Sequence, residues 1–171
     1  MSTTHATSSV AEPQPETAFR ALIRTFGLLE RIMQPYFARF GISGAQFGVM
    51  RTLQRAEQEG LPGLGVTDLS ERLWIRPPSV TGVVDRLVRD GLVTREALPA
   101  DRRVKQIRLT PKGKQRVGQV LEVHSRQIEK ILAGLTLEDQ SELQRLLGLL
   151  GQHLELLADN AQGAGKNVVN K

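Results

Sequence analysis

The segment from Val66 to Thr110 constrains the fold of this chain more than any other part of the sequence. It holds two short stretches with helical spacing of apolar residues, an alternating stretch, an arginine-rich turn and a second alternating stretch. Spacings of three and four indicate helices with one buried face, and alternation indicates strands with one covered face. Two helices followed by a hairpin are typical of a winged helix-turn-helix, which places its second helix in a DNA major groove.

The charge of this segment agrees with a DNA-binding role. The 171-residue chain has a formal net charge of +5, and residues 66–110 contain nine Lys and Arg against six Asp and Glu. This segment therefore carries +3 of the excess, and a polyanion would be expected to bind there. A charge of this size also suits an ordinary soluble surface, so charge alone does not decide the function.

Several protein classes are disfavoured by the sequence. The absence of cysteine excludes disulfides and thiol redox sensing. No apolar run approaches the ~18–20 residues of a membrane span, and the N-terminus does not resemble a secretory signal. We therefore expect a cytoplasmic protein without a membrane partner. No nucleophile–base pair, phosphate loop or metal-ligand spacing is present, and His5, His124 and His153 are far apart, so we expect no enzyme, cofactor or metal site.

The N-terminal part predicts an arm and two helices. Residues 1–15 are rich in Ser, Thr and Pro and predict a mobile arm. A first helix is expected over residues 16–40, with a kink at Pro35. Ser43 and Gln46 have the spacing of a capping box that starts a second helix, which should end near residue 60. The following Gly60–Gly65 loop predicts a flexible connector, since no Lys-Ser/Thr pair follows it.

The two helices of the central segment are predicted next. Thr67 is expected to cap the first, and Trp74 is expected to pack in the core rather than stack on a ligand. Arg76-Pro77-Pro78 should end that helix, and either proline can begin the next. An inner stripe is expected at Val80, Val83 or Val84, Leu87 and Val88. Gly91 should end the helix, with Leu92 closing its C-terminal motif.

Strands are expected at Leu92–Glu96 and Val104–Leu109, with residues 97–103 projecting as a wing between them. A long helix should begin at Thr110-Pro111 and end at Gly134, and Thr136 should cap the last helix. Five leucines of that last helix repeat at spacings of four and three, which predicts a heptad seam at a subunit interface. They are Leu143, Leu147, Leu150, Leu154 and Leu157.

Two motifs at this spacing resemble the MarR family of transcriptional regulators over about residues 16–157. The first is Ser79-Val80-Thr81-x-x-Val84-Asp85-Arg86-Leu87 with Gly91-Leu92-Val93. The second is Asp101-x-Arg103 and, after five intervening residues, Leu109-Thr110-x-x-Gly113. The resemblance implies a mainly α fold with a small β-hairpin wing, in which a winged helix-turn-helix core (43–110) is joined to dimerisation helices (16–40 and 111–158). Residues 159–171 are expected to be a frayed tail.

The resemblance also implies a homodimer that binds a pseudo-palindromic, that is nearly two-fold symmetric, double-stranded DNA operator, usually as a repressor. An effector-independent architectural DNA-binding protein is the alternative. Asp101 is expected to orient an arginine or cap the wing turn, and Arg103 to enter the minor groove. The DNA-contacting residues are expected to be Arg76, Ser79, Thr81, Arg86, Arg89, Arg102, Arg103 and Lys105.

By the same resemblance, a small and often aromatic effector would release the DNA. Its pocket is expected where the first, second and fifth helices meet the winged module. The candidates for this pocket are Phe19, Phe26, Tyr36, Phe47, Met50 and His124. Each of them also fits an ordinary core position, and His124 fits a hydrogen-bonded core histidine or a dimer contact.

Overall fold

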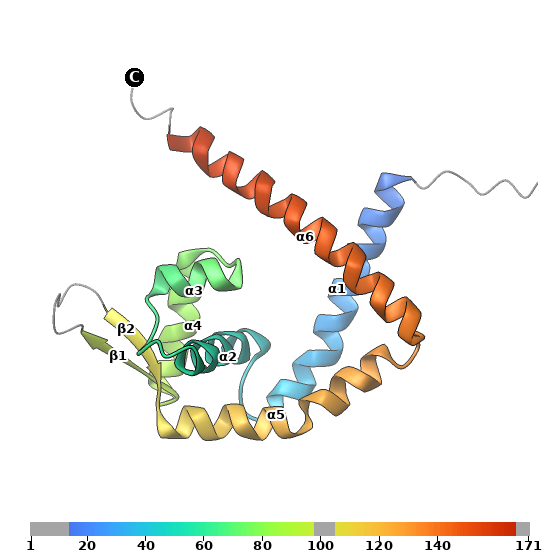
Figure 1. Ribbon diagram of the computed structural model, residues 1–171. Coiled ribbons are helices and arrows are strands. Elements are labelled where there is room, and N and C mark those ends of the chain that lie inside the picture. Colours follow the sequence, from blue (N-terminus) through green and yellow to red (C-terminus); the bar gives the residue numbers. More distant parts are fainter. Residues whose placement is uncertain (1–13, 98–104, 167–171) are drawn as a thin grey trace, which may run out of the picture. The chain divides into compact units, whose positions relative to one another are not determined.

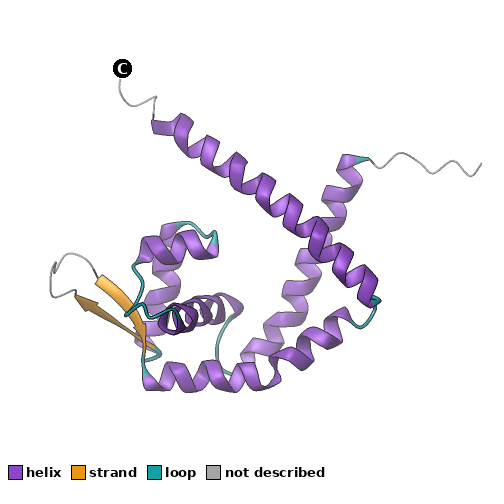
Figure 2. Ribbon diagram, in the orientation of Figure 1, coloured by secondary structure: helices purple, strands orange, loops and turns teal. Residues whose placement is uncertain are grey.

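The computed structural model describes residues 14–97 and 105–166 of the chain, so the predicted N-terminal arm falls almost wholly outside the described residues. Within these ranges it has six helices and one antiparallel hairpin, so the predicted mainly α fold with a β-hairpin wing is confirmed (Figures 1 and 2). Two compact units are present, one ending at Leu121 and the other beginning at Glu122, within a single helix. No helix in the described ranges is long and apolar enough to cross a membrane.

The first unit begins with α1 (Pro15–Ala38) and α2 (Gly44–Gln58). The predicted capping box at the start of α2 is confirmed. The Gln46 backbone N–H donates to Ser43 Oγ at 3.1 Å, and the Ser43 N–H donates to Gln46 Oε1 at 2.8 Å. These bonds satisfy donors that the first turn of a helix leaves without partners, and they fix where α2 starts.

The helix-turn-helix consists of α3 (Val66–Leu73) and α4 (Pro77–Arg89). The prediction that Thr67 caps α3 is wrong, because the N-cap is Gly65 and its N–H donates to Asp68 Oδ2 at 2.8 Å. An acidic residue at the third position can satisfy the N-cap N–H without a capping hydroxyl. For α4, the structure decides between the two prolines, and Pro77 is the first helical residue.

The wing strands are β1 (Val93–Ala97) and β2 (Lys105–Leu109), which pair from Val93 opposite Leu109 to Ala97 opposite Lys105. The connector between α2 and α3 is attached to this sheet, contrary to the prediction of a flexible segment. The Ile107 N–H donates to Leu64 O at 2.8 Å, and the Leu64 N–H donates to Ile107 O at 3.2 Å. Leu64 is buried, and its bridge to Ile107 adds a single-residue third strand to the edge of the hairpin.

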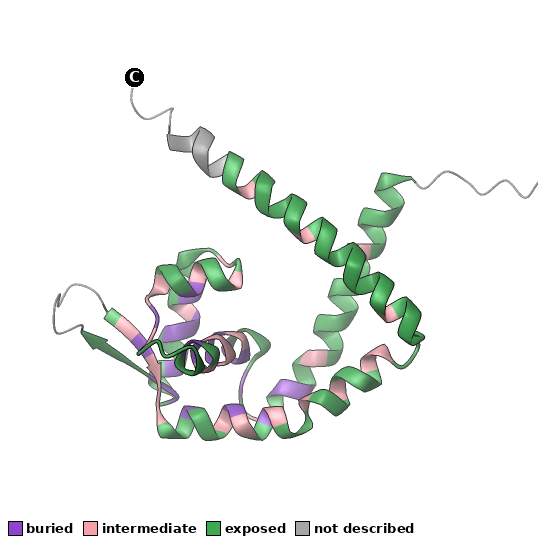
Figure 3. Ribbon diagram, viewed as in Figure 1, coloured by how far each residue is buried: buried purple, intermediate pink, exposed green. Residues whose placement is uncertain are grey.

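The core lies where α2, α3, α4 and the hairpin pack together, and buried residues gather there in Figure 3. The inner stripe of α4 is confirmed at Val80, Val83, Val84 and Leu87, whereas Val88 is 38% exposed. Trp74 is 65% exposed, so the prediction that it packs in the core is wrong. Sequence spacing could not decide these two, because both lie at the edge of an apolar run.

The helices α5 (Pro111–Leu132) and α6 (Leu137–Lys166) complete the described chain. The predicted cap of α6 is confirmed, since the Asp139 N–H donates to Thr136 Oγ1 at 3.1 Å. Hydrogen bonds from the Thr136 hydroxyl and backbone N–H hold the pKa of the Asp139 carboxyl below its usual value. Helix α6 continues to Lys166, beyond the predicted start of a frayed tail; residues 158–166 contain no proline that would stop it.

Candidate nucleic-acid interface

Helix α4 presents one apolar and one polar face. Val80, Val84 and Leu87 are buried, and the opposite face is exposed. Four residues predicted to contact DNA are on exposed positions of α4, namely Ser79, Thr81, Arg86 and Arg89. The apolar stripe therefore fixes the rotation of the helix about its axis and directs these polar side chains to solvent.

Two exposed side chains of α4, Thr81 and Arg86, differ in how their polar groups contact the rest of the helix. Thr81 Oγ1 donates to Pro77 O at 3.0 Å, so the hydroxyl bonds back to its own helix and keeps lone pairs that can accept. The Arg86 side chain extends back along the helix toward Gly82. A β-carbon added at Gly82 would lie 3.9 Å from Arg86 Nη1. Gly82 thus leaves the surface around the Arg86 guanidinium open.

The N-terminal end of α4 combines a helix dipole with an exposed cation. Arg76 is the N-cap, and no side chain caps the helix. Pro77 and Pro78 have no backbone N–H, so the first turn has fewer donors to satisfy. The positive end of the helix and the exposed Arg76 side chain would both attract a phosphate.

An ion pair links α4 to the wing, and sequence reasoning did not find it. Arg95 Nη2 on β1 lies 2.7 Å from Asp85 Oδ1 on α4, and both side chains are partly exposed. Such pairs contribute about 0–1 kcal/mol to stability. Its effect here is chiefly to orient the hairpin relative to α4 and to neutralise an acidic group on the face that would approach DNA.

The C-terminal end of α4 is held by the Thr110–Gly113 segment that the sequence motif contains. Gly91 has φ 68°, and the Leu92 N–H donates to Leu87 O at 2.9 Å, which confirms the predicted C-terminal motif. Thr110 Oγ1 donates to Gly91 O at 2.8 Å and accepts from the Gly113 N–H at 3.0 Å. Thr110 therefore caps α5 and fastens its start to the end of α4.

Two further bonds at this end involve residues that sequence reasoning did not assign to the site. Gln46 Nε2 donates to Asp90 Oδ2 at 3.1 Å, and Lys112 Nζ donates to Asp90 O at 2.8 Å. The Gln46 side chain is buried. Its amide oxygen caps α2, and its amide nitrogen bonds to Asp90 at the end of α4. The only sequence signal was the capping spacing of Gln46, which says nothing of its second partner.

The remaining predicted DNA contacts lie in the wing. Lys105 begins β2 and is exposed. Asp101, Arg102 and Arg103 lie outside the described residues, so their assignments stay predictions. The last pair of the hairpin is Ala97 with Lys105, so the two residues that flank 98–104 in the sequence lie side by side.

The six candidate effector residues fall into different environments. Tyr36, Phe47 and Met50 are buried in the core of the first unit. Phe19 and Phe26 on α1 are 64% and 59% exposed, and His124 on α5 is half-buried. The effector assignment of all six stays a prediction.

Tyr36 is fixed by specific contacts within that core. Its hydroxyl donates to Val120 O at 3.3 Å, and the Arg39 guanidinium lies 5.3 Å from the ring centroid. Burial raises the pKa of the Tyr36 hydroxyl, and the nearby Arg39 lowers it to a smaller extent. These contacts describe a core tyrosine that ties α1 to α5.

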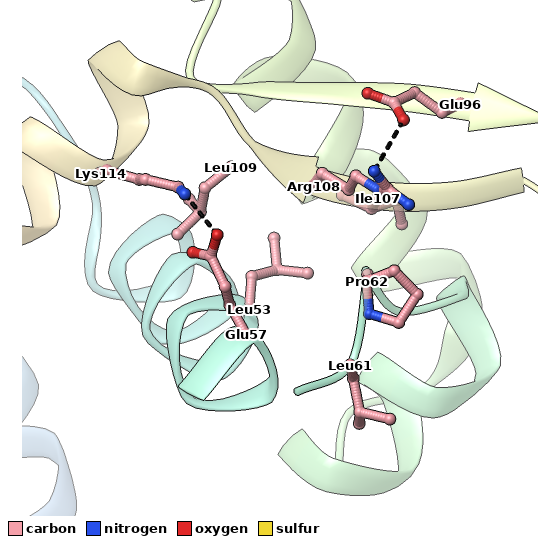
Figure 4. A pocket seen from close by; sticks show the side chains of 10 residues that line it. Leu53, Glu57, Leu61, Pro62, Glu96, Ile107, Arg108, Leu109 and Lys114 are labelled. Atoms are coloured by element: carbon pink, nitrogen blue, oxygen red, sulfur yellow. Dashed lines mark hydrogen bonds and ion pairs between the residues drawn. The ribbon is translucent and has the colours of Figure 1, made fainter. Parts of the chain in front are cut away.

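A cavity of about 350 Å³ lies elsewhere, between α2, the connector, the wing sheet and the start of α5 (Figure 4). Leu53, Pro62 and Ile107 form part of its apolar wall. Two ion pairs also line it, Lys114 with Glu57, and Arg108 with Glu96 at 3.3 Å. None of the six predicted effector residues lines this cavity.

Comparison with known proteins assigns the family. A family model described as MarR family matches residues 40–104. The HTH-type transcriptional repressor YetL of Bacillus subtilis is 30% identical over 131 residues, which are 77% of this chain and 77% of that protein. The chain belongs to the MarR family. It is therefore a winged-helix, DNA-binding member of a family of transcription regulators.

Solved MarR-fold structures show the same fold. A point mutant of MarR from E. coli, complexed with operator DNA, has a TM-score of 0.69 and 24% identity, covering 78% of this chain and 93% of that chain. BpsR of Bordetella bronchiseptica, from work on regulation of its DNA binding by 6-hydroxynicotinic acid, has a TM-score of 0.70 and 23% identity. That match covers 79% of this chain and 98% of BpsR.

Proposed function

We propose that this MarR-family protein is a homodimeric, sequence-specific repressor that binds a pseudo-palindromic operator and is released by a small, often aromatic, effector. The observation that carries the proposal is the exposed polar face of α4, with Thr81, Arg86 and Arg89 opposite a fully apolar buried stripe. A helix displayed in this way by a winged module can enter a major groove and read base edges.

In this proposal some residues read base edges and others bind the DNA backbone and position the protein. Ser79 and Thr81 would reach base edges or phosphates near the N-terminal end of α4, and Arg86 and Arg89 would bind guanine or phosphate. Arg103 would enter the minor groove, with Asp101 orienting the wing. Contacts to the DNA backbone would come from the cations Arg76, Arg102 and Lys105.

Exposed apolar surface on the helices proposed for dimerisation supports the homodimer. All five leucines of the predicted seam on α6 are exposed, as are Phe19, Ile23 and Phe26 of α1. Exposed apolar surface of this extent on a helix is unusual on a monomer and marks an interface. A two-fold axis would place two α4 helices about 34 Å apart, matching half-sites about 10 base pairs apart.

The proposed domain organisation follows from these assignments. Residues 43–110 would form the DNA-binding core, and residues 16–40 and 111–158 would supply the dimerisation helices. The proposal of an effector is supported by BpsR, whose DNA binding is described as regulated by 6-hydroxynicotinic acid. The comparison makes small aromatic acids the first compounds to test.

The decisive experiment selects duplexes from a random DNA library and compares the selected duplex with scrambled DNA at fixed salt. A specific regulator should prefer the selected duplex by about 10³-fold or more. Equal affinity for both duplexes would instead indicate the architectural DNA-binding protein. Sedimentation of the complex would show whether two chains bind one duplex, and the compounds named above should lower the affinity if the effector proposal holds.

A further inference from the structure

Four helices of the protein end in the same hydrogen-bonded turn, and one of them has an unexpected residue in it. A residue one to three positions past the end of the helix adopts a left-handed conformation, and the next N–H bonds to the carbonyl five residues earlier. In α1, α2 and α4 the left-handed residue is a glycine, namely Gly41, Gly60 and Gly91. At the end of α3 it is Trp74, with φ 54° and ψ 34°.

A tryptophan is poorly suited to this backbone conformation. The β-carbon of an L-residue approaches the following carbonyl oxygen there, so glycine normally occupies such positions. Among residues 14–97 and 105–166, Trp74 is the single non-glycine residue with a positive φ. The other three turns show that this chain uses glycine for the same geometry, so the tryptophan at position 74 requires its own explanation.

The turn is held in place by backbone and hydroxyl bonds that do not involve the Trp74 side chain. The Ile75 N–H donates to Ser70 O at 3.1 Å, and Ser70 Oγ donates back to Ile75 O. The Trp74 N–H donates to Glu71 O at 3.3 Å, and Ile75 packs against the core. A left-handed non-glycine residue persists where its surroundings over-determine it, and such residues concentrate at functional sites.

Core packing does not explain the indole. Trp74 is the sole tryptophan of the chain, and about two-thirds of its surface is exposed, whereas a tryptophan with a structural role is normally well buried. It precedes the exposed Arg76 by two residues and Pro77, the first residue of α4, by three. The exposed indole therefore lies at the N-terminal end of the proposed recognition helix.

We propose that Trp74 is a DNA-binding residue that packs its indole against the sugar-phosphate backbone at the edge of the major groove entered by α4. This inference rests on the proposed operator binding. Recognition helices approach base edges with their N-terminal residues, which brings the preceding turn close to the DNA backbone. The indole face can cover the apolar side of a deoxyribose while its N–H donates to a phosphate oxygen.

The chemistry of this contact predicts its effect on binding. Sugar and phosphate are the same at every nucleotide, so the contact raises affinity for all duplexes and adds little sequence choice. The indole carries no charge, so the contact releases no counterions and does not change the salt dependence of binding. Both properties distinguish Trp74 from Arg76, whose guanidinium would neutralise a phosphate.

The first test is Trp74→Gly, with fluorescence anisotropy on the selected and scrambled duplexes across a salt series. Affinity should fall by about tenfold or more on both duplexes, because apolar contact area is lost, with an unchanged slope of log K against log salt. The melting temperature should stay or rise, because glycine fits the left-handed turn. Trp74→Phe should retain most of the affinity, and Arg76→Ala should reduce the salt slope.

The matched control is Leu61→Ala, which truncates another partly exposed apolar residue in a loop, the α2–α3 connector. It should leave DNA affinity unchanged. If Trp74→Gly bound both duplexes as tightly as the wild-type protein, the assignment of Trp74 would be overturned and the proposed operator binding would stand. Failure of the wild-type protein to bind any duplex would overturn both proposals.

Fluorescence of the single tryptophan supplies an independent readout on the unmodified protein. Acrylamide should quench Trp74 strongly in the free protein and weakly in the DNA complex, because the bound backbone would cover the indole. Equal quenching in both states would contradict the proposal. An indole already shielded in the free dimer would also overturn it, since the residue would then lie at an interface between two copies of the chain.

Discussion

At the scale of single residues, Gly113 decides how closely the start of α5 can approach the end of α4. A β-carbon at Gly113 would lie 2.1 Å from the Leu92 carbonyl oxygen and 3.1 Å from a Leu109 methyl group. The Gly113 N–H also donates to Thr110 Oγ1, which in turn donates to Gly91 O. The position therefore tolerates no side chain without separating α5 from α4.

Gly113→Ala should lower the free energy of unfolding by about 2–3 kcal/mol, because the backbone must shift to relieve the contact. Gly118→Ala on the same helix is the matched control, since a β-carbon there meets nothing within 4 Å. That control should raise stability by about 0.5–1 kcal/mol, because alanine is the better helix former. Urea denaturation of the two variants measures both effects, and equal stabilities would contradict the steric assignment.

Arg86 is the residue at which the proposed base reading is best tested. Its guanidinium lies over Gly82 on the exposed face of α4. Arg86→Ala should weaken operator binding by about 1–3 kcal/mol and relax selection at one base pair of each half-site. The control is Arg126→Ala, an exposed arginine of α5 outside the winged module. Uniform loss across all duplexes would show that Arg86 contacts phosphate instead.

At the scale of elements, the wing is attached on both sides of its root. Arg95 pairs with Asp85 of α4, and Leu64 bonds to Ile107 in both directions. Ile107 is buried, so the hairpin is part of the core and not a free arm. If the wing contacts DNA as proposed, this attachment would let those contacts orient α4 in the groove.

Arg103→Ala should weaken operator binding by about 1–3 kcal/mol while the dimer stays intact, because a guanidinium in a narrow minor groove is lost. The loss should be larger on operators with A·T-rich flanks, where the minor groove is narrower. Titration of matched A·T- and G·C-flanked duplexes measures the difference. An unchanged affinity would remove Arg103 from the interface.

The cap of α6 predicts a pH dependence. The pKa of Asp139 is held below its ordinary value by the Thr136 hydroxyl and N–H. A lowered folded pKa contributes stability above the unfolded pKa, and this contribution disappears as pH falls through the folded pKa. Asp139→Asn should therefore melt below the wild-type protein at pH 7, and the two should converge below about pH 4. A constant difference down to pH 3 would contradict the role of the carboxylate.

At the scale of the whole molecule, the winged module formed by α2, α3, α4 and the hairpin is well packed, whereas residues 137–160 of α6 are almost all exposed (Figure 3). The five seam leucines of α6 are each at least 37% exposed, whereas Val80 and Leu87 of α4 are at most 1% exposed. Hydrophobic burial is the main source of stability, so the proposed dimer would supply burial that this helix lacks in one chain.

Leu150→Glu should therefore break the dimer and abolish operator binding together, because a carboxylate in the seam would be desolvated. The control Gln152→Glu adds the same charge on α6 away from the seam and should leave both properties unchanged. Light scattering and anisotropy measured on the same samples give the two readouts. A stable dimer in Leu150→Glu would show that α6 is not the interface.

Local sequence patterns were enough to predict the order of the elements, the Ser43 and Thr136 caps, the glycine that ends α4 and the polar face of that helix. These features depend on residues three to five positions apart, so local hydrogen bonding and apolar spacing suffice to predict them. Three features became visible only in the folded chain: Pro77 begins α4, the connector pairs with Ile107, and Gln46 bonds to Asp90, 44 residues away in sequence. The exposure of Trp74 also became clear only in the fold, because burial depends on which elements pack together and a local sequence pattern does not contain that information.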